Sequence, residues 1–104
     1  MRLKKESMLT IDDLFFKYSQ PARKFFAKHI SVREEFRFDV LKLLNHDHAE
    51  QVNYKRLHGK LKEYSRIAIG SYRIIYKVIN SEIIVVDVVM AGSRGDIYKK
   101  FQGR

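Results

Sequence analysis

The chain of 104 residues has no cysteine, which excludes a disulfide framework and a thiolate metal site. No apolar run is long enough to span a membrane, and the N-terminal stretch MRLKKESMLTIDD lacks the apolar block of a signal peptide. Internal repeats, low-complexity tracts, phosphate-binding glycine motifs and nucleophile elbows are missing too. We therefore expect one domain over residues 1–104 in a reducing cytoplasm, with residues 1–13 as a poorly fixed N-terminal extension.

Acidic residues are also scarce, since 12 Asp and Glu stand against 21 Lys and Arg, for a net charge of +9. A small domain with this excess attracts polyanions, of which nucleic acid is the commonest, although an acidic protein partner would fit the same charge. His46 and His48 could chelate a metal only with further ligands, and the sequence has no second cluster. We expect no metal, no cofactor and no membrane partner.

Three β-rich runs organise the second half of the chain: Tyr64–Ile69, Tyr72–Ile79 and Glu82–Ala91. Gly70-Ser71 and Asn80-Ser81 separate the runs, and both pairs suit two-residue hairpin turns. The third run is apolar on both faces, as is typical of an interior strand with cover on each side. The pattern predicts a three-stranded antiparallel meander.

A turn at Gly70-Ser71 decides which side chains share a face of this meander. Ala68 then pairs with Arg73, and Arg66 with Ile75. Arg66 and Arg73 become diagonal neighbours on one face, about 7–8 Å apart at the backbone. Two like charges in this position repel unless an anion lies beside them. The alternative is that both are solvated surface residues.

The register of the third run stays open because of Asp87, the one charged residue within its apolar core. A two-residue turn at Asn80-Ser81 places Asp87 on the core face opposite Ile74. A slip of one residue places it beside Arg73, where the two charges could pair.

Upstream of the meander, Leu14–Tyr18 is apolar and aromatic and predicts a first strand. Ser19 then fits a helix N-cap with Pro21 in the first turn, which predicts a helix over residues 20–29.

Ser31 and Glu34 have the spacing of a capping box, and apolar residues at helical spacing continue from there to Asn45. Two helices joined so closely should form an antiparallel hairpin that covers one face of the sheet. We therefore predict the α+β class, with an N-terminal helical hairpin packed on a small antiparallel β-sheet.

Residues 49–63 form a polar connector that leads into the first β-rich run. Its candidate nucleic-acid-binding residues are Lys55, Arg56, Lys60 and Lys62. A basic loop beside a sheet is suited to phosphate contacts, and a solvated loop is the alternative. After the third run, Gly92 and Gly95 mark a sharp exit that leaves Arg94 at the sheet edge, and Asp96 can cap a short helix that carries Tyr98.

The order of a basic loop, a Tyr-Arg hairpin, an apolar strand and a Gly-x-Arg tail resembles the RelE/ParE family of bacterial toxins. The matching stretches are GSYRIIYKV, IIVVDVVMAG and GSRGDIY, and the resemblance is clearest over residues 54–101. It implies a RelE-like fold and a toxin that a cognate acidic antitoxin holds inactive.

RelE-like members enter the ribosomal A site and cut the bound mRNA by attack of a 2′-hydroxyl on its own phosphate, whereas ParE-like members act on DNA gyrase. The resemblance implies a toxin of a type II toxin–antitoxin system. Our first expectation is a ribosome-dependent mRNA endoribonuclease, with ribosomal RNA and mRNA as partners. A gyrase inhibitor without nuclease activity and a non-toxic basic binding domain are the alternatives.

Under the nuclease hypothesis, the resemblance implies four catalytic residues. Arg73 corresponds to the phosphate-stabilising arginine, and Arg66 falls near a strand position that is often basic. Arg94 matches the arginine after the last strand, and Tyr98 the aromatic that stacks on a base or moves a proton. The arginine fork matches phosphate oxygens and stays protonated, so it suits a phosphorane whose negative charge grows in the transition state.

Two positions depart from the family pattern: Ala68 stands where some members have a second lysine, and Ser93 where many have a histidine. No residue is then an obvious general base at neutral pH. His58 is close in sequence, but the sequence does not indicate where it points. RelE-like members manage without a conventional base through charge stabilisation and substrate positioning in the ribosome.

Overall fold

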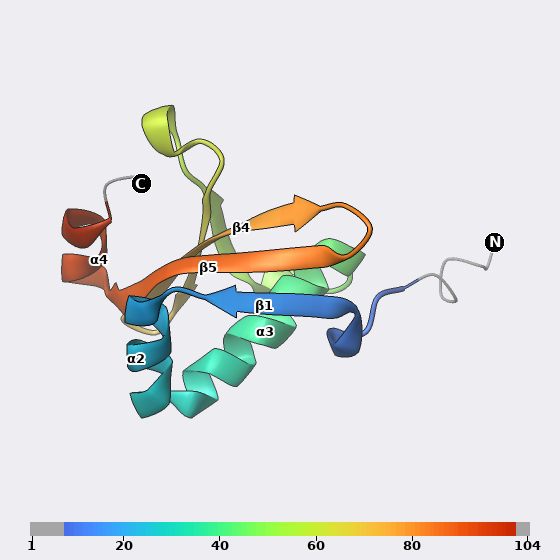
Figure 1. Ribbon diagram of the computed structural model, residues 1–104, viewed down its shortest axis with the longest axis horizontal. Coiled ribbons are helices and arrows are strands. Elements are labelled where there is room, and N and C mark those ends of the chain that lie inside the picture. The colour runs from blue at the N-terminus through green and yellow to red at the C-terminus, as the bar shows by residue number, and fades with distance from the viewer. Residues whose placement is uncertain (1–7, 102–104) are drawn as a thin grey trace.

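The computed structural model describes residues 8–101, which form a five-stranded sheet with three helices around it (Figure 1). The strands are β1 (Leu14–Tyr18), β2 (Asn53–Arg56), β3 (Ser65–Ile69), β4 (Tyr72–Asn80) and β5 (Ile84–Ser93). The helices are α2 (Gln20–Lys28), α3 (Ile30–Asn45) and α4 (Arg94–Lys100), with short 3₁₀ turns η1 (Ile11–Asp13), η2 (Ala49–Gln51) and η3 (Gly59–Leu61). None of the helices in this part of the chain has the length and apolar character needed to cross a membrane.

The sheet is mixed and has the strand order β1-β5-β4-β3-β2. β1 lies parallel to β5, and all other neighbours are antiparallel. The predicted α+β class is confirmed, and so is the strand Leu14–Tyr18. The predicted order and sheet type are wrong. The described fold begins with η1 and β1 rather than with the helical hairpin, and β1 pairs in parallel with the distant strand β5, so the sheet is mixed rather than antiparallel.

The β3–β4 hairpin has the predicted register. Ala68 pairs with Arg73 and Arg66 with Ile75, so the two arginines share a face. Gly70 has φ +60°, a backbone conformation that glycine adopts without a steric cost, so this turn depends on its first residue.

The β4–β5 connection differs from the prediction. Asn80 pairs with Ile84, so residues 81–83 form the loop and the predicted two-residue turn is wrong. Asp87 therefore lies opposite Lys77, at neither of the two positions considered. A bulge between Ile75 and Tyr76 shifts the pairing once more and sets Gly92 opposite Arg73.

The first predicted helix cap is correct, because the Ser19 hydroxyl accepts a hydrogen bond from the Ala22 backbone N–H at 3.2 Å. The second is wrong: α3 begins at Ile30, directly after the end of α2, so Ser31 lies inside the helix and cannot cap it. The end of α3 at Asn45 is confirmed.

The predicted N-terminal extension, residues 1–13, is described only in part, since residues 1–7 lie outside the described residues. Leu9 forms two hydrogen bonds with the Asn45 side chain, both of 2.9 Å, which hold this segment against the end of α3.

Two hydrophobic clusters lie on opposite faces of the sheet. The larger one joins Ile74 to residues of α2 and α3 such as Phe26 and Phe36. The smaller one, which we call the second core, consists of Leu57, Tyr64, Ile75, Ile97 and Phe101. Because Ile74 and Ile75 are consecutive on β4, they point to opposite faces. The helix α4, which supplies Ile97, therefore lies across the sheet from α2 and α3.

Candidate functional site

A groove of about 350 Å³ opens on the α4 side of the sheet, beside the second core, and its lining is basic. We call it the arginine groove, and it is lined by Lys55, Leu57, His58, Arg66, Arg73, Arg94 and Tyr98. The four residues predicted to be catalytic are thus brought together. Within the described part of the chain, no acidic side chain belongs to this lining.

The β3–β4 hairpin carries two of the arginines, and hydrogen bonds hold both of their side chains. Arg73 Nη1 donates to the carbonyl oxygens of Gly70 at 2.9 Å and Tyr72 at 3.0 Å. Arg66 Nη1 donates to the Asn53 side-chain oxygen at 3.0 Å, while the buried Arg66 Nε–H has no acceptor among the described residues. Both guanidinium groups are therefore oriented before any ligand arrives.

The helix α4 supplies the other two predicted side chains. Arg94 is its first residue, and the Arg94 backbone N–H donates to the Ser71 carbonyl at 2.9 Å, which fastens the helix to the β3–β4 turn. Ile97 and Phe101 anchor the helix in the second core, with 1% and 5% of their surface exposed. Tyr98 lies between these anchors in sequence and is 43% exposed at the groove.

The start of α4 corrects one prediction. The residue at the N-cap position is Ser93, and Asp96 lies in the first turn, so Asp96 does not cap the helix. Asp96 instead accepts a hydrogen bond of 3.3 Å from the Ser93 hydroxyl.

The electrostatics of the groove favour an anion. Partial burial and the nearby positive charges of Arg66 and Arg94 lower the pKa of Arg73, while Tyr98 opposes this shift. The shift means that the protonated Arg73 is held at an electrostatic cost. A phosphate among these side chains would offset the part of that cost that comes from repulsion between the arginines.

The four basic residues predicted as one phosphate-binding loop are divided by the structure. The segment is partly a strand, and Lys55 pairs with Arg66 in the β2–β3 ladder, so it lies in the arginine groove. Arg56 points to the opposite face, where its Nε donates to the Lys62 carbonyl at 3.0 Å. Lys60 and Lys62 are exposed in and after η3 and do not line the groove.

Sequence reasoning missed the groove positions of Lys55 and His58. The segment NYKR has no apolar alternation, so nothing in the sequence marked it as a strand. The only local signal is that Lys55 and Leu57 would share a face in any extended segment.

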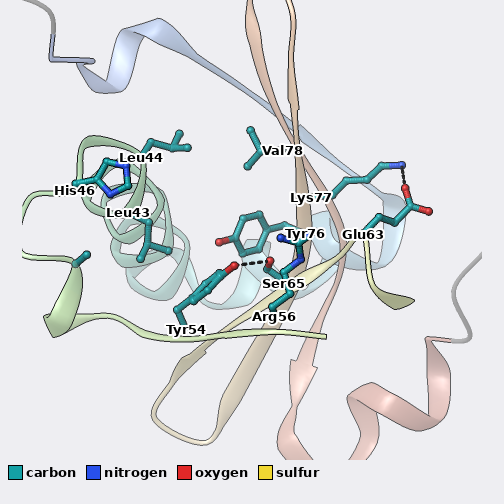
Figure 2. A pocket seen from close by; sticks show the side chains of 11 residues that line it. Leu43, Leu44, His46, Tyr54, Arg56, Glu63, Ser65, Tyr76, Lys77 and Val78 are labelled. Atoms are coloured by element: carbon teal, nitrogen blue, oxygen red, sulfur yellow. Dashed lines mark hydrogen bonds and ion pairs between the residues drawn. The ribbon is translucent and has the colours of Figure 1, made fainter. Parts of the chain in front are cut away.

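Figure 2 shows a second cavity, of about 430 Å³, on the helix side of the sheet between the end of α3 and strands β2 to β4. Its polar groups are largely paired: the Tyr54 hydroxyl and the Ser65 hydroxyl are 3.1 Å apart, and Lys77 Nζ lies 3.3 Å from a Glu63 carboxylate oxygen (Figure 2). Burial raises the pKa of Tyr76, which keeps that phenol protonated. Of the predicted site residues only Arg56 reaches this cavity, so the arginine groove is the stronger candidate.

The histidine pair lies in the loop that follows α3. His46 and His48 both adopt positive φ in the loop after α3, and His48 lies 3.5 Å from Asp47. No group of three or more His, Cys, Asp or Glu side chains with the arrangement of a metal site occurs in the described part of the chain.

Comparison with known proteins gives one similarity. A family model described as "ParE toxin of type II toxin-antitoxin system, parDE" matches residues 16–95, which is more than half of the chain. The matched region contains Arg66, Arg73 and Arg94 and ends before Tyr98. No curated protein and no solved structure gave a significant match.

Proposed function

The chain belongs to the ParE toxin family of type II toxin–antitoxin systems, within the RelE/ParE superfamily, and from this premise we propose that it is a toxin that cuts mRNA on the ribosome. Membership of the family implies a cognate antitoxin as partner. One observation carries the nuclease proposal: Arg66, Arg73, Arg94 and Tyr98 converge on one groove that has no acidic lining residue among those described.

The proposed reaction needs strong charge stabilisation. The 2′-oxygen of a nucleotide attacks its own phosphorus while the bond from phosphorus to the 5′-oxygen breaks, which gives a 2′,3′-cyclic phosphate and a 5′-hydroxyl. Negative charge grows on the phosphate oxygens, and the three guanidinium groups that line the groove, two of them already oriented, can donate hydrogen bonds to them. The lowered pKa of Arg73 supports its assignment to the centre of this charge, because an anion there removes existing repulsion.

The reaction also moves two protons, one from the 2′-hydroxyl and one to the 5′-oxygen. Histidine is the side chain that ordinarily titrates nearest neutral pH, and His58 lies in the lining of the groove. We assign His58 to proton transfer and Tyr98 to stacking on a base or to the second proton. Lys55, which faces Arg66 across the ladder, is assigned to a neighbouring mRNA phosphate.

Ribosome binding is assigned to the exposed residues outside the groove. Lys60 and Lys62 are at the projecting η3 turn, where they can reach ribosomal RNA phosphates while mRNA occupies the groove. Arg56 is turned to the other face of β2, so it stays a weaker candidate for the same role.

Gyrase inhibition without nuclease activity is the second candidate, and the family description favours it, because it names the ParE toxin and the match ends before Tyr98. The test is to incubate the purified chain with programmed ribosomes and to map the 5′-hydroxyl ends of any mRNA fragments. A parallel assay measures DNA supercoiling by gyrase. Cleavage in the A site supports the proposal, whereas intact mRNA together with inhibited supercoiling would replace it by the second candidate.

A further inference from the structure

A third cavity, of about 650 Å³, lies between α2 and the end of β5, outside the arginine groove. We infer that this cavity binds a nucleobase of the same RNA strand whose phosphate occupies the arginine groove. The inference rests on the proposed nuclease function. It adds a subsite that would select bases beside the cleavage point.

The open edge of β5 forms one wall of this cavity. β1 ends at Tyr18, opposite Val88, so beyond that point β5 has no neighbouring strand on this side among the described residues (Figure 1). Residues 90–93 line the cavity along this edge. Strands present backbone N–H and C=O groups along their edges, and such groups can hydrogen-bond the polar edge of a planar base.

Two rings on α2 and at its end form the opposite wall. Phe25 and His29 are stacked, with centroids 4.3 Å apart and an interplanar angle of 25°, and both line the cavity. Tyr72 supports the pair, with its centroid 5.1 Å from Phe25 and 4.7 Å from His29. Because the rings hold one another in place, a base can stack on them with little further ordering, as on the aromatic platforms of single-strand-binding proteins.

Charge and connection to the arginine groove favour RNA over a peptide. Lys24 and Lys28 are exposed at the cavity, and its described lining has no acidic residue. Ser93 lines the cavity and the next residue, Arg94, lines the groove, so one strand of RNA could follow the end of β5 from one to the other. Tyr72 and Arg73 are also consecutive but point to opposite faces of β4, so this path runs around the end of the sheet. A basic rim around an aromatic platform is the usual composition of single-stranded nucleic-acid sites.

The test uses the full chain and a short RNA in which 2′-O-methyl groups prevent cleavage and 5-iodouracil replaces one base at a time. After irradiation, mass spectrometry locates the cross-linked peptide. Fluorescence anisotropy gives the Kd for the unchanged chain, for Phe25→Leu and for a matched control, Phe15→Leu. Leucine keeps apolar contacts but removes the ring, and Phe15 lies on β1, away from this cavity and 57% exposed.

We expect one position of the RNA to cross-link to the peptide that contains Phe25. Phe25→Leu should weaken binding roughly ten- to a hundredfold, as the loss of one base stack does, and Phe15→Leu should leave it unchanged. Equal affinity for Phe25→Leu and Phe15→Leu, or cross-links to Tyr98 alone, would overturn the base subsite while the nuclease proposal stands. If the unchanged chain neither binds RNA nor cuts mRNA, both proposals fail. Loss of antitoxin binding but not RNA binding in Phe25→Leu would make the cavity a protein-docking site and refute the inference.

Discussion

Replacing Arg73 by alanine is the most informative single change in this chain, because the side chain is held rigidly and yet supports little of the fold. The substitution removes two hydrogen bonds, from Arg73 Nη1 to the carbonyl oxygens of Gly70 and Tyr72. It also removes one of three neighbouring guanidinium charges; burial, and after it the repulsion from Arg66 and Arg94, lowers the pKa of Arg73. The two effects on stability have opposite signs.

The expected effect of Arg73→Ala on the free energy of unfolding is much smaller than its effect on the activation free energy of cleavage. Each lost hydrogen bond costs about 0.5 kcal/mol, the low end of the usual range, since the freed carbonyl groups near the surface can bind water, and the relief of repulsion offsets part of this. We expect the free energy of unfolding to change by less than about 1 kcal/mol, or a Tm shift of no more than about 8 °C for a chain of this size. Losing a donor to a developing oxyanion costs on the order of 3–4 kcal/mol, which is roughly 10²–10³ in the cleavage rate.

The assay is single-turnover cleavage of mRNA on programmed ribosomes, with circular dichroism as the check on folding. Arg73→Lys should recover only part of the rate, because a point charge does not reproduce the planar fork. Arg33→Ala on α3, which removes an arginine from the helix side, is the matched control and should keep the full rate. If Arg73→Ala folds, stays fully toxic and neither form cuts mRNA, the nuclease reasoning is refuted and gyrase becomes the target to test.

Three further changes test other parts of the structure. The double change of Lys60 and Lys62 to glutamine should weaken ribosome binding. The slope of log K against log salt concentration should become shallower by about 0.7 per lost phosphate contact, while the cleavage rate at saturating ribosome stays within about twofold. Ile97→Ala should lower the free energy of unfolding by about 2–5 kcal/mol in urea titrations, and cleavage should fall in the molecules that remain folded, because α4 carries two groove side chains. Burial, and to a lesser degree Glu35, raises the pKa of Asp39, so ionisation of this carboxyl opposes folding as pH rises through the raised value. Asp39→Asn should therefore be more stable than the unchanged chain at neutral pH, and urea titrations should show this difference shrinking toward pH 4.

The sequence predicted the hairpin that carries Arg66 and Arg73 because its determinants are local. Gly70 favours the positive φ of the turn, and β-branched residues alternate on both sides of it. The parallel pairing of β1 with β5 joins residues that are about seventy positions apart, and no local pattern encodes such a contact. The strand β2 was not predicted, for a related reason. Its segment is polar and becomes a strand because it pairs with β3, not because of its own β propensity.

In the candidate site, too, features with local determinants were predicted, and features that depend on distant contacts were not. The shared face of Arg66 and Arg73 followed from counting residues around a turn, whereas the position of Arg94 was expected from its place at the strand end and its role from a family resemblance. The second core was not foreseen: Ile75 was placed on the face of the arginines, and the structure buries it fully against Ile97 of α4. The contact depends on where α4 folds back, which the tail sequence leaves undetermined.

This second core explains how three like charges can stay together without an anion. Cations that repel one another cannot assemble a groove by themselves, so the favourable free energy must come from elsewhere. Burial of Ile97 and Phe101 against β4 and its neighbours supplies it, since complete burial of one large apolar side chain is worth about 1.5–3 kcal/mol. The tail helix is thus held by apolar contacts on one side and presents Arg94 and Tyr98 from the other. An anion that enters the groove then relieves a repulsion already present in the folded chain, so part of its binding free energy is gained without any new ordering of the protein.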